Sequence, residues 1–269
     1  MKDDLRLAVV GAGKMGGTLI HGLIQSGVSP QAIVATTAGA ESRERIAAAE
    51  GIGTVEDNQT AVREADVVLL CVKPQRVDRV LGEISGELDS GKLLISIAAG
   101  VSTSRLEERV GEGVPVVRAM PNTPSLVAKG MTAICGGSRA NESHLALAEE
   151  IFAAMGNTVV LDESHFDAVT GLAASGPAFV YIIIESLAEG GVKVGLPRKI
   201  ATECAAQACL GAAEMVLQTG SAPALLKDDV TTPAGCTMDG ILKLEEGGLR
   251  VTLIKAVVEA ARRAGELVD

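Results

Sequence analysis

The sequence has very few aromatic side chains and no excess of basic ones. Its 269 residues include three Phe, one Tyr and no Trp, and 24 Lys and Arg stand against 34 Asp and Glu. Proteins that bind single-stranded nucleic acid stack bases on aromatic rings, and nucleic-acid binding in general needs a basic face. The two deficits together argue against a nucleic-acid partner.

Cysteine and histidine are also scarce. The five Cys and three His show neither a Cys-x-x-Cys nor a Cys/His spacing, so we expect no metal site. An odd number of scattered thiols is typical of a reducing compartment. The first residues lack the charged start, apolar stretch and cleavage site of a signal peptide. We therefore expect a cytoplasmic protein.

Long apolar runs are scarce as well, although one of them has to be considered as a membrane span. In the most apolar stretch, Ala178–Val194, the charged residues Glu185, Glu189 and Lys193 recur every four residues. On a helix they would form a polar stripe along one face. A buried helix at a subunit interface explains this pattern better than a membrane span, which needs about 20 mainly apolar residues.

Residues 1–162 alternate between apolar, β-branched runs and helical stretches such as 15–25 and 41–50. This alternation is typical of a mostly parallel sheet covered by helices on both faces. Strands are expected at Leu5–Val10, Ile33–Thr36, Asp66–Val72, Lys92–Ile97, Val114–Met120, Met131–Cys135 and Thr158–Leu161.

Residues 163–269 lack strand-like runs and are expected to form a separate helical domain. Gly195 and Gly220 stand where glycines end helices. The fold class is therefore α/β, with a doubly wound sheet domain followed by an all-α C-terminal domain. Its helices are expected over Pro177–Val194, from Pro197 to Thr219, from about Pro233, and over Arg250–Leu267.

A glycine motif links the first expected strand to the first helix. Leu5–Val10 leads into Gly11-x-Gly13-x-x-Gly16, and a helical pattern follows at once. In such motifs the first glycine permits a tight turn, the second lets a pyrophosphate approach the backbone, and the third brings the helix close to the sheet. Free amides at the helix start favour the phosphates. The context predicts a dinucleotide-binding domain of the Rossmann type.

The end of the second strand indicates which dinucleotide is bound. An NAD enzyme usually carries Asp or Glu there to hold the ribose 2′-hydroxyl. After Thr36 no acid occurs before Glu41, whereas Thr37, Ser42 and Arg43 form a set able to hold a 2′-phosphate. This favours NADPH, with NADH still possible. The alternative is that Ser42 and Arg43 merely open a solvated helix.

The expected positions of the histidines bear on which reaction the chain can catalyse. Carbonyl and alcohol dehydrogenases generally need a proton-transferring group near the hydride carbon, often His or Lys. His21, His144 and His165 are all expected to be surface or packing residues. A protonated imine is already electrophilic, so its reduction needs no further proton at nitrogen. An imine is therefore a better substrate for this chain than a carbonyl.

Two expected helix starts in the second domain could bind the carboxylate of such a substrate. They are Ala174–Pro177 and Thr231–Thr237, and each combines hydroxyl groups with free backbone amides. Plain helix capping by Ser or Thr explains the same residues equally well.

Across its whole length the chain resembles the pyrroline-5-carboxylate reductase family, which catalyses the last step of proline biosynthesis. The matching segments occur in the family's order: Gly11–Gly16, Cys71–Gln75, Ser96–Val101, Arg118–Pro124, Gly176–Val180, Leu225–Asp228 and Thr231–Thr237. The resemblance implies reduction of 1-pyrroline-5-carboxylate to L-proline by hydride transfer from NADPH. It also implies that the helical domain mediates a homodimer or a higher oligomer of dimers.

The resemblance implies roles for individual residues too. Asn58 would lie near the adenosine ribose, the segments around Lys73 and Ala99 would line the cofactor, and Thr237 would donate its hydroxyl to the ring nitrogen as the catalytic residue. The substrate-binding residues would be Ser175, Gly235, Cys236 and Thr237. With Thr36, the cofactor-binding residues would be Gly11, Ala12, Gly13, Lys14, Met15, Gly16, Asn58, Val72, Lys73, Pro74, Ala98, Ala99, Gly100, Met120 and Asn122.

The substrate loop departs from the family's usual Ser-Pro-Gly-Gly-Thr/Ala-Thr at two positions. Ala234 replaces a glycine, so its backbone must avoid the left-handed conformation or accept strain. Cys236 replaces a small residue, and we interpret it as a small apolar side chain rather than a redox group.

Two other activities are compatible with parts of the sequence. A reductase of a related cyclic imine acid or of a β-hydroxy acid is the nearest alternative, but the hydroxy-acid version needs a buried Lys or His, and Lys193 and Lys199 are expected to be exposed. A cofactor-binding regulator without catalysis would have lost the substrate loop, which is largely intact.

Overall fold

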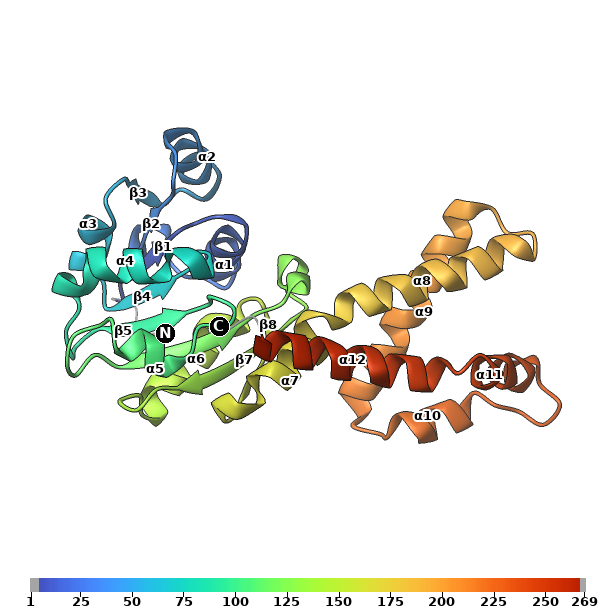
Figure 1. Cartoon of the computed structure of the whole chain (residues 1–269). Helices are drawn as coiled ribbons and strands as arrows, with labels where there is room; N and C mark the ends of the chain where they lie inside the picture. Colours follow the sequence, from blue (N-terminus) through green and yellow to red (C-terminus); the bar gives the residue numbers. More distant parts are fainter. Residues whose placement is uncertain (1–4, 267–269) are drawn as a thin grey trace. The chain divides into compact units, whose positions relative to one another are not determined.

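The computed structural model describes residues 5–266, which form two compact units (Figure 1). One unit holds the sheet and comprises residues 5–174 and 261–266; the other is helical and comprises residues 175–260. Residues 163–174 pack with the sheet unit because Phe166, which is 1% exposed, is buried against Ala133 and Cys135.

The sheet unit contains an eight-stranded sheet in the order β3-β2-β1-β4-β5-β6-β7-β8. Every neighbouring pair is parallel except β6 and β7, which are antiparallel. The order 3-2-1-4-5-6 is that of a Rossmann sheet, so the expected fold class is confirmed. The strands are β1 Leu7–Val10, β2 Ile33–Thr36, β3 Gly53–Val55, β4 Val67–Leu70, β5 Leu93–Ser96, β6 Val116–Met120, β7 Gly130–Gly136 and β8 Gly156–Val160.

Hydrophobic cores lie on both faces of this sheet. Successive strand residues point to opposite faces, so Leu7 and Val9 belong to one core whereas Ala8 and Val10 belong to the other. Helices α1 and α6 contribute to the first core, and α3, α4 and α5 to the second. The helices of this unit are α1 Lys14–Gln25, α2 Ala40–Glu50, α3 Asn58–Arg63, α4 Val77–Ile84, α5 Thr103–Glu107, α6 Glu142–Ala153 and α7 Phe166–Val169.

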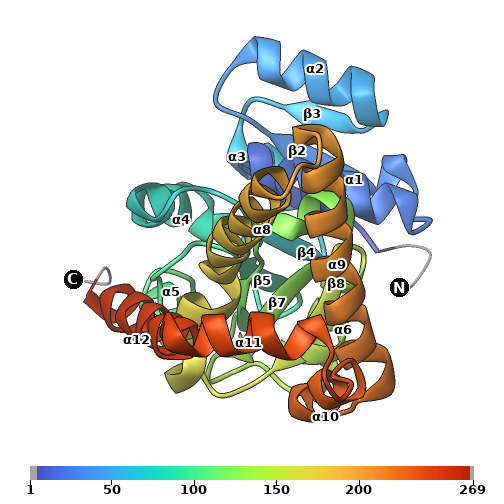
Figure 2. The same ribbon diagram turned by 90° about the vertical axis from the view of Figure 1, so that its right-hand side faces the viewer.

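The helical unit is built mainly on the contact between α8 and α9, which lie side by side (Figure 2). The two helices come close because their contact residues are small: Ala188, Ala201 and Ala205 are buried, and a Cβ atom on Gly191 would lie 3.0 Å from that of Ala201. Gly195 has a positive φ of 107°, as expected for a glycine after a helix. The helices are α8 Gly176–Lys193, α9 Arg198–Thr219, α10 Pro223–Asp229, α11 Cys236–Glu246 and α12 Leu249–Glu266.

Large apolar side chains of the helical unit remain exposed in the single chain. On α12, Val251, Ile254 and Val258 follow one another at helical spacing and are 54–62% exposed. Residues 163–193 and 198–219 are long and apolar enough to cross a membrane by length and composition alone. Such a surface marks a contact that the single chain leaves open. Further exposed apolar residues are Tyr181, Ile182 and Leu187 on α8, Leu210, Met215 and Leu217 on α9, and Met238, Leu242 and Leu244 on α11.

Candidate active site

The three glycines of the loop after β1 have different surroundings. Gly11 has φ +90°, and a Cβ atom there would lie 2.7 Å from Val72. A Cβ on Gly16 would lie 3.0 Å from the carbonyl oxygen of Gly11. Nothing lies within 4 Å of a Cβ on Gly13. The fold therefore requires Gly11 and Gly16, whereas the space beside Gly13 is open to a ligand.

The amino end of α1 has the properties of an anion site. The first helical bond runs from the Gly17 amide to the Gly13 carbonyl, at 2.8 Å. The amides of Lys14, Met15 and Gly16 precede it and have no partner within the helix. No side chain caps this end and no acid stands in its first turn. These amides fit the pyrophosphate of a dinucleotide.

A chain of hydrogen bonds holds the glycine loop in place. The Gly11 amide donates to Thr36 Oγ1 (3.1 Å), the Thr36 hydroxyl donates to Asn58 Oδ1 (2.8 Å), and Asn58 Nδ2 donates to Glu83 (2.8 Å). Thr36 and Asn58 thus fix the loop to β2, α3 and α4 while they face the cleft. The role of Asn58 toward Glu83 has no signal in the sequence, because the two residues meet only in the fold.

A cleft of about 1250 Å³ runs along the carboxyl ends of the strands in the sheet unit. This is where doubly wound sheets bind dinucleotides. Most of the residues expected to hold the cofactor line it: Gly11, Ala12, Gly13, Lys14, Met15, Thr36, Asn58, Val72, Lys73, Pro74, Ala98, Ala99 and Met120. The lining also includes residues that the sequence did not single out, among them Glu56, Arg76, Arg79, Thr123 and Leu126.

Gly16, Gly100 and Asn122 are not among the lining residues. Gly16 is buried on the face of α1 that lies against Val9 and Cys71, and Gly100 has φ +73° in the turn after β5. The amide group of Asn122 is engaged on both sides: it donates to the carbonyl of Ala173 (2.8 Å) and accepts from the Met131 amide (2.9 Å). In this structure Asn122 therefore braces the segment after β6.

Beside β2, the cleft is lined by hydroxyl groups and a guanidinium. Thr37, Ser42 and Arg43 line it there, and no acid lies between Thr36 and Glu41. The Arg43 side chain is only 17% exposed and pairs with Glu56 at 2.8 Å. A guanidinium and hydroxyl groups suit a 2′-phosphate, so the donors present fit NADP.

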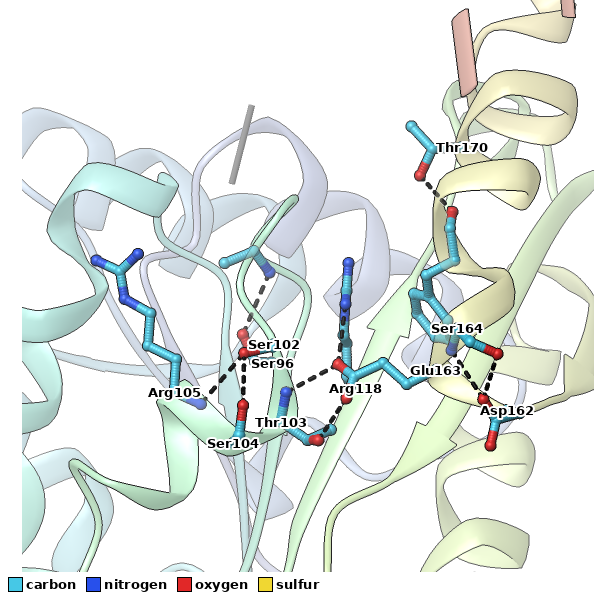
Figure 3. Close-up of polar contacts among 12 residues, drawn as sticks. Ser96, Ser102, Thr103, Ser104, Arg105, Arg118, Asp162, Glu163, Ser164 and Thr170 are labelled. Carbon is cyan, nitrogen blue, oxygen red and sulfur yellow. Dashed lines mark hydrogen bonds and ion pairs between the residues drawn. The ribbon is translucent and has the colours of Figure 1, made fainter. Parts of the chain in front are cut away.

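An ion pair outside the cleft lining joins three segments (Figure 3). The carboxylate of Glu163 accepts from the amide and hydroxyl of Thr103 (2.8 and 2.6 Å) and from Arg118 (2.9 Å). Arg118 is 7% exposed and stacks over the ring of Phe166 at 4.4 Å. The network ties α5, β6 and the segment before α7 together, and so fixes the ends that carry Gly100 and Met120.

The same network controls the ionisation of Glu163. Burial alone would raise the pKa of this carboxyl, but the hydrogen bonds from Thr103 and Arg118 and the charge of Arg118 lower the pKa below its ordinary value. The group therefore carries its charge at neutral pH, and Arg118 is neutralised in the interior.

In the helical unit, the expected substrate loop is a tight turn. The Gly235 amide donates to the carbonyl of Thr232 at 2.9 Å, with Pro233 and Ala234 at the central positions. Ala234 has φ +62°, the positive value that a type II turn requires at its third position and that normally selects glycine. A Cβ on Gly235 would lie 2.5 Å from Thr232 Oγ1. Ala234 thus accepts the strain that its glycine-like position imposes.

Ser175 precedes α8 and Gly235 precedes α11, and no side chain caps either of these helix starts. The expected free amides are not found at α8: this helix continues from a π-helical turn at Thr170–Ala174, Pro177 has no N–H, and the Ala178 amide donates to the Ser175 carbonyl (3.0 Å). At α11 the Met238 amide donates to the Gly235 carbonyl (3.2 Å), and the Cys236 and Thr237 amides before it have no partner within the helix. Cys236 and Thr237 lie exposed on the first turn of α11. The first turn of α8 and the first turn of α11 lie at opposite ends of the helical unit (Figure 1).

None of the three histidines is among the residues that line the cleft. His21 Nδ1 is 3.1 Å from Glu50, and His144 accepts a hydrogen bond from the Asn141 amide in a capping box on α6. His165 belongs to a 3-10 turn before α7.

Comparisons with known proteins agree with this architecture. Residues 163–267 match the family model for pyrroline-5-carboxylate reductase dimerisation, and residues 6–100 match that for NADP oxidoreductase, coenzyme F420-dependent. The chain is 45% identical to pyrroline-5-carboxylate reductase of Methanosarcina acetivorans over 98% of both chains. It is 41% identical to that of Arabidopsis thaliana over 98% of this chain and 96% of the relative.

Solved structures give the same result. The pyrroline-5-carboxylate reductase of Coxiella burnetii superposes with a TM-score of 0.95 at 34% identity over 99% of both chains. That of Plasmodium falciparum, with NADP bound, gives 0.87 at 30% identity over 99% of both chains. The expected resemblance is confirmed over the whole length, and the match to the dimerisation model indicates a homo-oligomer. The chain belongs to the pyrroline-5-carboxylate reductase family.

Proposed function

We propose that the chain reduces 1-pyrroline-5-carboxylate to L-proline with NADPH. The observation that carries the proposal is the lining of the cleft beyond β5 and β6, where Ile97, Ala98, Ala99, Met120 and Pro121 bring no ionisable side chain among the described residues. Such a lining is poorly suited to a carbonyl, which needs a proton at oxygen. It suits a protonated imine, whose nitrogen already carries its proton.

The chain's own residues bind, orient and shield the reactants. When bound, NADPH would supply the hydride for the C=N carbon. The Lys14–Gly16 amides would hold its pyrophosphate, and Ala98 and Met120 would exclude water from the reacting end. The Cys236 and Thr237 amides at the start of α11, together with the Ser175 hydroxyl before α8, would bind the substrate carboxylate. In the protonated imine the ring N–H donates to the Thr237 hydroxyl, which fixes the ring's orientation. Once reduction has given the nitrogen a lone pair, the same hydroxyl can donate to it.

The complete site requires two copies of the chain. Ser175 and Thr237 belong to helix starts at opposite ends of the helical unit, so the loop of a second copy completes the set. This copy also covers the apolar faces of α8, α9, α11 and α12, which makes a dimer the basic unit of a cytoplasmic, membrane-free assembly. In this arrangement residues 1–162 bind the dinucleotide and residues 163–269 bind substrate and partner.

The decisive assay follows NADPH oxidation with 1-pyrroline-5-carboxylate, beside a six-membered cyclic imine acid and a β-keto acid. We expect the pyrroline to give the highest kcat/KM, and no oxidation with it would overturn the proposal. Thr237→Ala should lower kcat/KM about 100-fold while the Kd for NADP⁺ is unchanged. Thr202→Ala is the matched control, because in the described part of the chain the Thr202 hydroxyl bonds to the Arg198 carbonyl of its own helix (3.0 Å). An unchanged kcat/KM in Thr237→Ala would remove Thr237 from the mechanism.

A further inference from the structure

An acid from outside the expected binding set lies beside Arg43 in the cofactor cleft. Arg43 is on α2, and Glu56 follows β3 directly; Arg43 Nη2 donates to Glu56 at 2.8 Å. Both residues line the cleft. The Arg43 side chain is largely covered, whereas that of Glu56 is 84% exposed. Arg43 is also within 3.5 Å of the Thr37 carbonyl, which keeps its guanidinium at the end of β2.

The end of β2 is where this fold holds the adenosine ribose. A phosphate on the 2′-oxygen would be bound best by a guanidinium through two parallel hydrogen bonds. In the structure, Glu56 already takes one of the Arg43 nitrogen atoms that such a phosphate would use. A carboxylate and a phosphate cannot both hold this edge of Arg43, and their like charges repel.

We propose that Glu56 is a specificity-determining residue that competes with the 2′-phosphate of NADPH for Arg43. NADH has a neutral 2′-hydroxyl, so it does not meet this competition, and the carboxylate offers that hydroxyl an acceptor. Glu56 thereby weakens the binding of NADPH but not of NADH, so the enzyme prefers NADPH by a smaller factor. The inference rests on the proposed cofactor cleft and is independent of the imine chemistry.

The size of the effect follows from the exposure of the pair. An exposed ion pair is weak and is screened by salt. Removing the charge of Glu56 should therefore tighten NADP⁺ binding about three- to fivefold at low ionic strength, and less at high ionic strength. Binding of NAD⁺ should not tighten. Since Glu56 is exposed, its replacement should leave the melting temperature unchanged.

Isothermal titration calorimetry of the full-length protein with NADP⁺ and NAD⁺ tests the proposal. Glu56→Gln is compared with Glu87→Gln, which removes the same charge from another ion pair, that with Arg63 at 3.0 Å. We expect Glu56→Gln to lower the Kd of NADP⁺ alone and Glu87→Gln to change neither Kd. Arg43→Gln should raise the Kd of NADP⁺ at least tenfold and abolish the effect of Glu56→Gln in the double variant.

Each other outcome is informative. If Glu56→Gln tightens both dinucleotides equally, or still tightens NADP⁺ when Arg43 is Gln, the competition does not exist. If the wild type binds NADP⁺ and Glu56→Gln leaves its Kd unchanged, this inference fails while the proposed function stands. If the wild type binds neither dinucleotide, the cofactor cleft itself is wrong.

Discussion

Two glycines of the motif should respond differently to substitution by alanine: one variant should lose affinity for the cofactor, and the other should lose stability. In Gly13→Ala the new Cβ meets nothing within 4 Å and φ is −77°, so the chain should fold normally. The methyl group would stand where the pyrophosphate approaches, and we expect the Kd of NADP⁺ to rise about tenfold or more. Gly11→Ala combines φ +90° with a 2.7 Å approach to Val72, so it should lose about 2 kcal/mol or more of stability.

Thermal unfolding and NADP⁺ titration of both variants separate these effects. A Gly13→Ala variant that binds NADP⁺ like the wild type would show that the open space beside Gly13 is not the pyrophosphate site. A Gly11→Ala variant as stable as the wild type would contradict the strain argument.

At the residue scale, the sequence predicted local conformations and binding positions better than it predicted which side chains contact one another. The glycine motif, the missing acid after Thr36 and the strained position of Ala234 follow from local chemistry, because φ preferences and helix amides are properties of short segments. The pairing of Arg43 with Glu56 and the bracing of Asn122 depend on residues brought together only by the fold. The binding roles of the cleft residues stay predictions until the variants are measured.

At the scale of elements, the ion pair of Glu163 should make stability depend on pH. Its folded pKa lies below the ordinary value of 4.5. A carboxyl with a lowered folded pKa contributes stability above its ordinary pKa and loses that contribution as the pH falls through the folded pKa. Glu163→Gln should therefore cost about 1–3 kcal/mol at neutral pH, and its difference from the wild type should shrink in acid below pH 4.5.

Urea unfolding of wild type and Glu163→Gln across this range checks the sign. Glu112→Gln, on an exposed loop, is the control for a lost charge outside the network. A difference between wild type and Glu163→Gln that stays constant into acid would exclude ionisation of Glu163 as its cause. Movement of β6 and α5 should also weaken NADP⁺ binding modestly in Glu163→Gln, because Met120 ends β6 and Gly100 lies just before α5.

The elements themselves were predicted where the periodicity was long. Seven of the eight strands and the long helices follow from apolar runs and glycine or proline boundaries, with ends shifted by a few residues. The structure adds β3 Gly53–Val55, which has only three residues and lies at the edge of the sheet. It also adds α10, a seven-residue helix. Segments this short bury too little to leave an apolar pattern in the sequence.

At the scale of the whole molecule, the helical unit explains why the chain is an oligomer. Its buried core consists of Ala188, Ala201 and Ala205 with Ile184 and Val192 packed against them. So few small side chains bury little apolar area, and below a sizeable core helices are only marginally stable alone. The exposed faces of α8, α9, α11 and α12 supply the missing area once a second copy covers them, and a stable pair needs roughly 1,200 Å² or more of buried surface.

Ile254→Glu places a charge in the centre of the α12 stripe and should therefore separate the subunits. An unpaired, buried charge costs several kcal/mol, so we expect sedimentation velocity to show a shift toward monomer. The kcat should fall about 100-fold or more, because the proposed site takes its substrate loop from the second copy. Binding of NADP⁺ should persist, since the cofactor cleft lies within the sheet unit of one chain. Val160→Glu, at an exposed apolar position on β8 of the sheet unit, should leave the assembly intact. Loss of NADP⁺ binding together with activity would point to unfolding instead, and an intact, active oligomer would show that α12 faces solvent. Recovery of the wild type only with membranes would contradict a second copy as the partner of these helices.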